Sequence, residues 1–262
     1  MTVLLIDFNN MVHRARAGFG RGPHAITYTF LLMLRKTVEK FSPGKLYIVK
    51  EGRPQRRHDT FGEYKTNRSS AGDDFWRQHS EICEILAKMP VSIVRHPLRE
   101  CDDTIAHLAR VTHLDDECII VSTDTDFIQL LSPESGRIRL WNPIKESWVS
   151  PCNYSYVDWK SLVGDGSDNI PGFKGVGGKT AEKLLANQQK LEEFLQQPGH
   201  RDKFLMNRDL ISFHEIHDEL ESFEDDTDWD ATRARLTEMG FQSIVSDKSW
   251  NKYINTFSTL KE

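Results

Sequence analysis

The 262-residue sequence has no long apolar run. No stretch approaches the ~20 consecutive apolar residues that a transmembrane helix needs. The apolar segment after Met1, Val3-Leu4-Leu5-Ile6, is too short for a secretory signal peptide. We therefore expect a cytoplasmic protein that does not bind membranes. Its 38% hydrophobic and 28% charged residues are typical of a soluble globular chain.

Cysteine is scarce, and none of the four is paired at the short spacing of a zinc site or a disulfide framework: Cys83, Cys101, Cys118 and Cys152. We interpret them as reduced thiols of the core. His214 and His217 stand three residues apart, which is not the spacing of an H-E-x-x-H metal motif. The sequence therefore offers oxygen ligands, and not sulfur or nitrogen, for any metal ion.

The chain also lacks an overall basic excess, since its formal net charge is −5. The distribution is uneven, because residues 215–230 hold nine acids and no Lys or Arg, while residues 1–214 hold 29 basic against 27 acidic residues. Nine of those 27 acids belong to the metal site proposed below, and without them the basic residues dominate. Such a surface suits a polyanion, although evenly spread charges would only keep the protein in solution. We expect 215–230 to be a solvated linker, with a partner contact as the alternative.

Strand and helix patterns alternate through the first half of the sequence. Short apolar runs predict strands, and apolar residues at helical spacing predict the helices between them. This order indicates an α/β fold whose central, mostly parallel sheet is flanked by helices on both faces. The expected strands are 3–7, 46–49, 91–94 and 118–121, and the expected helices are 24–41, 76–89 and 101–112.

The second half has a different pattern. A hairpin is expected over 138–141 and 147–149, and the remaining chain is mainly helical. We therefore divide the chain into an α/β core over 1–150 and a helical portion over 151–262. The helices expected there are 155–163, 180–188, 190–197, 200–214 and one or two within 231–257.

Acidic residues follow the predicted strands at their carboxyl ends. Ligands of parallel sheets bind at this edge, so acids far apart in the sequence should converge there. Single acids at helix starts and turns have ordinary capping roles, but so many at one edge need another explanation. The acids are Asp7, Glu51, Glu100, Asp102, Asp103, Asp124 and Asp126, joined by Asp165 and Asp168 from a glycine-rich turn.

Such a cluster suits two divalent cations. Hard cations such as Mg²⁺ prefer oxygen ligands. A pair of them about 4 Å apart can activate water and neutralise the charge that develops during phosphodiester hydrolysis. The sequence therefore predicts a two-metal site that uses Mg²⁺, for which Mn²⁺ can substitute.

A glycine-rich stretch over 172–180 contains Gly-Lys-Thr but is not a P-loop. Phe173 stands where that motif needs glycine, and no strand precedes it. We predict instead a helix–loop–helix clamp whose backbone amides and lysines hold a DNA phosphate without reading sequence. The residues concerned are Lys174, Gly175, Val176, Gly177, Gly178, Lys179 and Thr180.

Basic and aromatic side chains are interleaved between residues 53 and 68. Positive charge beside an aromatic ring can hold a strand terminus and stack on its base, while the alternative is a solvated basic loop. The residues are Arg53, Arg56, Arg57, His58, Lys65 and Arg68, with Phe61 and Tyr64.

Four ordered motifs resemble the 5′-3′ exonucleases of the flap endonuclease superfamily, which include the 5′-nuclease domain of bacterial DNA polymerase I. The similarity runs from Leu4 to about His217. The motifs are Leu-Ile-Asp7-Phe-Asn, Tyr64-Lys65-Thr-Asn-Arg68, Glu100-Cys-Asp102-Asp103 with Ser-Thr-Asp124-Thr-Asp126, and Gly164-Asp165-Gly-Ser-Asp168-Asn-Ile-Pro-Gly followed by Gly-Val-Gly-Gly-Lys-Thr-Ala.

The resemblance implies a role for each acid. One metal ion would be bound by Asp7, Glu51, Glu100 and Asp102, of which Asp7 and Asp102 would be central to catalysis. The other would be bound by Asp124, Asp126, Asp165 and Asp168, with Asp103 outside the direct ligands. The family has Asp where this chain has Glu51, so the longer side chain leaves its direct ligation open.

The resemblance also implies how DNA is handled. Lys65 and Arg68 would contact the reacting phosphate, and Tyr64 would stack on a base. Residues 69–98 would form a helical arch, which is compact here. Residues 155–188 would form a helix–three-turn–helix whose carbonyls hold K⁺ against the duplex.

The expected function is structure-specific hydrolysis of DNA from 5′ ends or at flaps by a monomer. RNA in RNA–DNA hybrids is a second candidate substrate. Two rivals stay open: a non-catalytic relative that binds DNA structures, and a PIN-like ribonuclease. The glycine-rich clamp argues against the ribonuclease, and the full set of acids argues against the non-catalytic protein.

Overall fold

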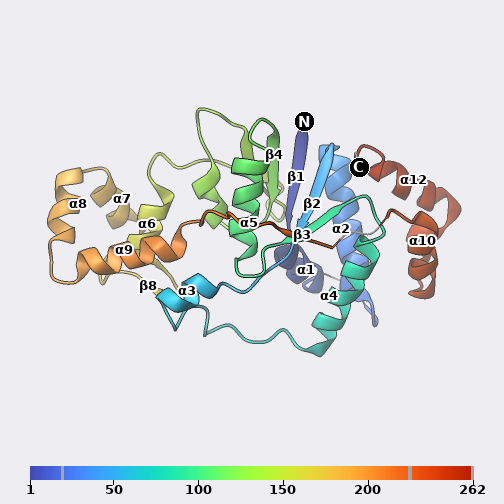
Figure 1. The fold of residues 1–262 in the computed structure, drawn as a ribbon, viewed down its shortest axis with the longest axis horizontal. Helices are drawn as coiled ribbons and strands as arrows, with labels where there is room; N and C mark the ends of the chain where they lie inside the picture. Colours follow the sequence, from blue (N-terminus) through green and yellow to red (C-terminus); the bar gives the residue numbers. More distant parts are fainter. Residues whose placement is uncertain (19–20, 224–225, 261–262) are drawn as a thin grey trace.

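The computed structural model describes residues 1–18, 21–223 and 226–260, which form a seven-stranded sheet with helices on both faces (Figure 1). The central strands β5, β4, β1, β2 and β3 are parallel, and the outer strands β6 and β9 are antiparallel to their neighbours. This confirms the predicted α/β fold. In sheet order the strands are β6 (Ser147–Val149), β5 (Ile138–Asn142), β4 (Glu117–Val121), β1 (Thr2–Asp7), β2 (Lys45–Val49), β3 (Ser92–Arg95) and β9 (Glu221–Ser222).

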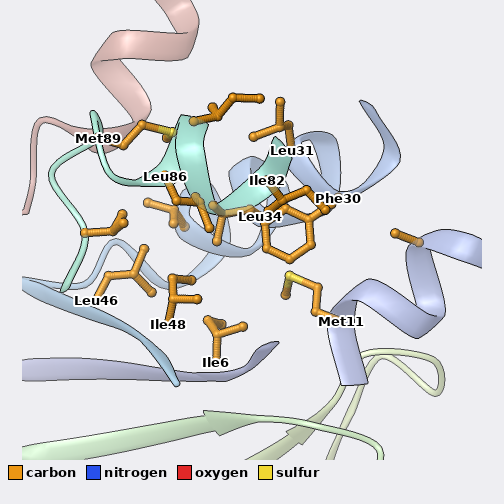
Figure 2. Packing of buried hydrophobic residues seen from close by; sticks show 14 of the residues in the cluster. Ile6, Met11, Phe30, Leu31, Leu34, Leu46, Ile48, Ile82, Leu86 and Met89 are labelled. Carbon is orange, nitrogen blue, oxygen red and sulfur yellow. The ribbon is translucent and has the colours of Figure 1, made fainter. Parts of the chain in front are cut away.

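Helices cover both faces of the central strands. Each strand therefore contributes to two cores, because its successive side chains point in opposite directions. Leu4 and Ile6 of β1 face one core, and Val3 and Leu5 face the other. The larger core contains α1 (Phe8–Arg16), α2 (Ala25–Phe41) and α4 (Asp73–Leu86). Figure 2 shows this face, where side chains of the sheet meet those of α2 and α4: Ile6, Leu46 and Ile48 against Phe30, Leu34, Ile82 and Leu86.

The second core lies beneath α5 (Cys101–His107), which continues into a π-helical turn over Leu108–Thr112. A 3₁₀ helix over Asp126–Leu130 follows β4 and buries Phe127 in the same core. Both α5 and the 3₁₀ helix begin just beyond the carboxyl ends of strands. Their first residues are therefore held at the edge of the sheet where the predicted acids converge.

A helical portion extends from one end of the sheet (Figure 1). It is built from α6 (Tyr156–Val163), α7 (Gly178–Leu185), α8 (Gln188–Leu195) and α9 (His200–Ile211), with the short hairpin β7 (Gly164–Asp165) and β8 (Ile170–Pro171). Leu162, Phe173, Ala181, Leu195 and Phe204 form its own small core. Gly172 lets β8 run close to α6, because a Cβ there would lie 1.8 Å from the Val163 carbonyl oxygen.

The last helices do not belong to this helical portion, contrary to the prediction of one unit over 151–262. The helices α10 (Trp229–Glu238), α11 (Gln242–Val245) and α12 (Asp247–Phe257) return to the opposite end of the sheet (Figure 1). Leu236, Trp250, Tyr253 and Phe257 are buried in the larger core with α2 and α4. The apolar faces of these helices need a partner, and α2 provides it.

The acidic run over 215–230 is not simply a solvated linker, although residues 224–225 lie outside the described part of the chain. Ile216 is buried, and Glu221–Ser222 form β9 against β3. Glu221 forms an ion pair with Arg95 at 2.6 Å, and Arg95 and Lys50 lie over the ring of Phe223. The run thus covers the open edge of β3, where Glu221 pairs with the basic residue of that strand.

Much of the predicted arch over 69–98 is packed into the core and the sheet. Helix α4 buries Phe75, Ile82 and Ile85 against the core, and β3 lies inside the sheet. The segment on the outside of the molecule is the shorter connection from α3 (Gln55–Thr60) to α4 (Figure 1). The alternating apolar side chains of 82–94 make that part a packed helix and strand.

In residues 1–18, 21–223 and 226–260, no helix has the length and apolarity needed to cross a membrane.

Candidate active site

A cavity of about 460 Å³ lies at the carboxyl edge of the sheet. The predicted acids that line it come from four separate parts of the sequence, as the alternation of strands and helices requires. Basic side chains face them across the same cavity, Lys65 and Arg68 among them. The acids are Asp7, Glu51, Glu100, Asp102 and Asp124.

Local structure fixes Asp7 and Glu100. Asp7 is the last residue of β1 and caps α1, since its Oδ1 accepts the Asn10 amide at 3.0 Å. Its other oxygen accepts the Ser122 hydroxyl at 2.9 Å. Glu100 caps α5 through a reciprocal capping box with Asp103. The capping role that competed with the catalytic interpretation is therefore real, but it also orients both side chains.

Asp126, Asp165 and Asp168 lie beside the cavity and join the sheet to the helical portion. Asp168 is 2.5 Å from Arg68 and 3.6 Å from Lys65, and the Tyr64 hydroxyl donates to it at 3.2 Å. Asp126 and Asp165 both contact Lys160 of α6, Asp126 also accepts from the Tyr156 hydroxyl, and Asp165 from Ser167. All nine predicted acids thus lie in one connected region, which includes Asp103 through its contact with Glu100.

Crowding perturbs several of these carboxyl groups. Desolvation and the charge of Asp124 raise the pKa of Asp7 to about 6 against its hydrogen bonds. Desolvation and the Glu100 carboxylate raise the pKa of Glu51 to about 8, and burial raises the pKa of Asp102 well above its ordinary value. The region holds more negative charge than it can stabilise unaided, which is the condition that bound cations relieve.

The chemistry of the donors fits divalent hard cations, because the lining supplies carboxylate oxygens and no cysteine sulfur. In the described residues, however, no three His, Cys, Asp or Glu side chains are already arranged to surround a metal ion. The ammonium groups of Lys65 and Lys160 lie between carboxylates instead, Lys65 contacting Glu100 and Lys160 contacting Asp126 and Asp165.

Lys65 also has an unusual backbone. Its φ is 56°, in the left-handed region that non-glycine residues rarely adopt. Its amide donates to the Asp168 carbonyl at 3.1 Å, which ties this turn to the β7–β8 hairpin. Strain of this kind persists only where surrounding contacts fix it, and it gathers at functional sites.

Tyr64, which was predicted to stack on a DNA base, lies inside the protein. Its side chain is only 2% exposed. Its hydroxyl donates to Glu100 at 2.8 Å and to Asp168, so the ring supports the acids from behind. The sequence could not show this, because the same Tyr-Lys pattern suits an exposed or a buried ring.

Arg57 was predicted to bind DNA but lies in the interior, 4% exposed. Its guanidinium contacts Asp103 through both nitrogens, at 2.6 and 2.9 Å, and Glu100 at 2.8 Å. It also donates to the carbonyls of Leu210 and Ser212. Arg57 is therefore a positioning residue, and Asp103 is committed to it.

The other predicted DNA-binding residues are at the surface, with one exception. Arg53 is exposed, and Arg56 is exposed but paired with Asp209 at 2.6 Å. In the glycine-rich loop the side chain of Val176 is buried in the core of the helical portion, and Gly178 packs against Trp159. The exposed members of the loop are Lys174, Gly175, Gly177, Lys179 and Thr180.

Several side chains of the region were not predicted. Asn9, Asn10 and His13 of α1 line the cavity, and Asn10 donates to the Thr123 hydroxyl at 2.6 Å. Only the Asn9-Asn10 pair, which Phe8 separates from Asp7, signalled them. Lys160 was also missed, although a lysine among the apolar residues of a short helix is a signal of a buried charge.

Comparison with known proteins gives consistent matches. Residues 2–158 match the 5′-3′ exonuclease N-terminal resolvase-like domain, and residues 152–238 match the 5′-3′ exonuclease C-terminal SAM fold. A 5′-3′ exonuclease of Mycoplasmopsis pulmonis is 31% identical over 204 residues, covering 72% of this chain and 68% of that protein. The thermostable DNA polymerase I of Thermus aquaticus is 32% identical over 79% of this chain.

The chain spans only 27% of the length of that polymerase. Among solved structures, a flap endonuclease of bacteriophage T5 in a pseudo-enzyme–product complex with DNA and metal ions has the same fold. Its TM-score is 0.66 at 15% identity, over 99% of both chains.

Proposed function

Because this chain belongs to the 5′-3′ exonuclease family, we propose that it hydrolyses DNA phosphodiesters at 5′ ends and 5′ flaps, leaving 5′-phosphate products. The observation that supports this most strongly is the convergence of Asp7, Glu51, Glu100, Asp102 and Asp124 on one cavity that also contains Lys65 and Arg68. Carboxylates alone would repel a phosphate. A site that combines carboxylates with fixed cations, and has room for divalent ions, can bind a phosphate group and hydrolyse its ester bond.

We assign two Mg²⁺ ions to this region, with Mn²⁺ as a substitute. Asp7, Glu51, Glu100 and Asp102 would hold one ion, and Asp124, Asp126, Asp165 and Asp168 the other. When bound, the ions supply the positive charge that activates the attacking water and stabilises the leaving oxygen. Asp103 is no ligand in this proposal, because Arg57 occupies both of its oxygens.

The chain's own groups would orient the substrate. Lys65 and Arg68 project into the cavity and would bind the non-bridging oxygens of the reacting phosphate, where fixed cations stabilise developing charge. Ser122 and the Asn10 amide hold Asp7 in one orientation. Tyr64 does the same for Glu100 and Asp168. The acids are therefore preorganised by neutral hydrogen-bond donors.

The exposed loop at the start of α7 would grip the duplex away from the cleavage site. Lys174 and Lys179 are exposed there, and Gly175 has a φ of 78° in open space. The amides at the helix start favour a phosphate, and carbonyls of the loop would hold K⁺. The bacteriophage T5 structure with DNA supports a DNA partner of this kind. Since one chain supplies the whole acid cluster, we propose that it acts as a monomer.

A direct test uses a 5′-labelled flap and a nicked duplex, each incubated with the protein in Mg²⁺ or in EDTA. Cleavage in Mg²⁺ alone, with products carrying a 5′-phosphate, is the expected result. The Asp124→Asn and Asp165→Asn proteins should bind the flap and leave it intact. Cleavage at the wild-type rate by either variant would overturn the two-metal assignment.

The same assay separates the alternatives. Binding of the flap without cleavage in Mg²⁺ or Mn²⁺ would identify a non-catalytic DNA-binding relative. Preferred cleavage of a matched single-stranded RNA would identify a ribonuclease. An RNA–DNA hybrid with RNA at the 5′ end tests the second candidate substrate. It should be cut at the same junction as the DNA duplex, but more slowly.

A further inference from the structure

Lys160 occupies an unusual position beside the acid cluster. It lies on α6, in the helical portion, yet its side chain is 8% exposed and reaches back to the edge of the sheet. Its ammonium contacts Asp126 of the 3₁₀ helix and lies 2.6 Å from Asp165 of β7. Two carboxylates from different elements are thus joined through one cation that the chain itself provides.

Both partners of Lys160 are proposed metal ligands, and this inference rests on that assignment. An ammonium ion and a divalent cation repel each other strongly over a few ångströms in a partly buried site. Lys160 contacts Oδ1 of Asp126 and Oδ2 of Asp165, so it competes with a divalent cation for the negative charge of both carboxylates.

Arg57 provides an instructive contrast. Its guanidinium is anchored by Asp103, by Glu100 and by the carbonyls of Leu210 and Ser212, so it cannot leave without abandoning several bonds. The ammonium of Lys160 is bonded, among the described residues, to the two carboxylates. Its flexible stem lets it move without disturbing α6.

We propose that Lys160 is an exchangeable internal cation, which neutralises Asp126 and Asp165 in the metal-free protein and gives up these carboxylates when a divalent ion binds. Lys160 is a positioning residue in this scheme, since it acts through the two acids and not on DNA. Its charge stabilises the metal-free protein and weakens the affinity of the site for metal. Both effects measure the same coupling free energy, between the contacts of Lys160 with the two acids and the binding of metal by those acids.

The test measures metal binding without DNA. Mn²⁺ is titrated into the full chain, and free Mn²⁺ is followed by electron paramagnetic resonance, with thermal unfolding in EDTA and in saturating Mn²⁺ alongside. The variants are Lys160→Gln and Lys160→Met, which remove the charge, and Lys160→Arg, which keeps it. The control is Lys203→Gln on α9, because Lys203 is a half-buried lysine whose ammonium bonds to the Gly172 carbonyl at 2.6 Å.

The uncharged variants should bind Mn²⁺ about tenfold more tightly, within the usual range of such couplings. They should also melt at a lower temperature than the wild type in EDTA and recover most of that loss in Mn²⁺. Lys160→Arg and Lys203→Gln should bind Mn²⁺ with wild-type affinity. Measuring glutamine and methionine variants together keeps the test valid if one of them fails to fold.

Two results would overturn the proposal in different ways. If the uncharged variants lose stability equally in EDTA and Mn²⁺ and bind Mn²⁺ as the wild type does, Lys160 is only a structural ion pair, and the nuclease assignment is unaffected. If the wild-type chain binds no Mn²⁺ at all, both the metal site and the role of Lys160 fail. Flap cleavage is scored separately, so the two failures are distinguishable.

Discussion

Arg57 and Asp103 form a bidentate ion pair inside the protein, with nitrogen–oxygen distances of 2.6 and 2.9 Å. Arg57 comes from α3 and Asp103 from the first turn of α5, which carries Glu100 and Asp102 into the site. The same guanidinium reaches the carbonyls at the end of α9. One buried cation therefore fixes the position of the active-site helix relative to the helical portion.

Removal of this cation should be costly. Arg57→Gln leaves the Asp103 charge buried without its partner, and we expect the free energy of unfolding to fall by about 3–5 kcal/mol. Urea denaturation measures this free energy of unfolding. Arg56→Gln is the matched control, because its ion pair with Asp209 is exposed and should be worth less than about 1 kcal/mol. Equal losses in the two variants would show that Arg57 has no special structural role.

Tyr64→Phe tests the buried position of that ring. Loss of the hydroxyl removes the donor to Glu100 and Asp168, and we expect a loss of about 1–3 kcal/mol in unfolding free energy. If Tyr64 stacked on a base, phenylalanine would stack equally well and stability would not change. The control is Tyr28→Phe, because the Tyr28 hydroxyl bonds to Ser243 at the surface, at 2.7 Å.

Lys65→Ala should reduce flap cleavage with little effect on DNA affinity. The ammonium lies in the cavity and would stabilise charge that develops on the reacting phosphate, so single-turnover rates should fall about 10²–10³-fold. Rapid-quench measurements on the labelled flap give the rate. Lys36→Ala, which removes an exposed ammonium paired with Glu146, should leave that rate unchanged. A fall in binding that accounts for the whole defect would contradict a role in the chemical step.

Lys174→Gln should weaken duplex binding without affecting the acids. A lysine that contacts one phosphate contributes about one unit to the slope of log K against log salt, so the variant's slope should be about one unit shallower. Fluorescence anisotropy at several salt concentrations measures this. Lys248→Gln on α12, at the other end of the molecule, is the control. An unchanged slope for Lys174→Gln would remove that lysine from the proposed clamp.

The helices after residue 228 should unfold together with the sheet. Phe257 is 1% exposed in the larger core, and Phe257→Ala should cost about 3–5 kcal/mol. Leu205→Ala, at a position 51% exposed, should be nearly neutral. The decisive observation is the shape of the transition. A single cooperative transition shifted by Phe257→Ala supports one core, whereas a separate early transition would show that α10–α12 form an independent unit.

Sequence periodicity was sufficient for the strands of the sheet other than β9, and for the edge where Asp7, Glu51, Glu100 and Asp124 meet. Strands that are buried on both faces leave continuous apolar runs, and acids that end those runs are easily placed. The burial of single polar residues, in contrast, leaves no pattern in the sequence comparable to the apolar runs of the strands. Tyr64 and Arg57 stand in a basic segment that is equally compatible with an exposed loop, and only the packing of α3 against α5 and α9 determines which side chains face inward.

Long-range packing explains the other differences. The apolar pattern of 231–257 predicted helices but did not identify α2 as their partner. The acids of 215–230 suggested solvent exposure, because Arg95, which pairs with Glu221, lies far away in the sequence. Lys160 could be recognised only once the fold had brought Asp126 and Asp165 together. Each of these features depends on contacts between residues that are distant in the chain.

Strand β9 has a mechanical consequence. The chain leaves the sheet after β6, builds α6–α9, and returns through β9 to the edge of β3 before completing the core with α10–α12. The helical portion is therefore an insertion held by two anchors and not a module on a single tether. It cannot swing freely while both anchors hold, so a duplex seated on its loop would keep a fixed register with the acid-lined cavity.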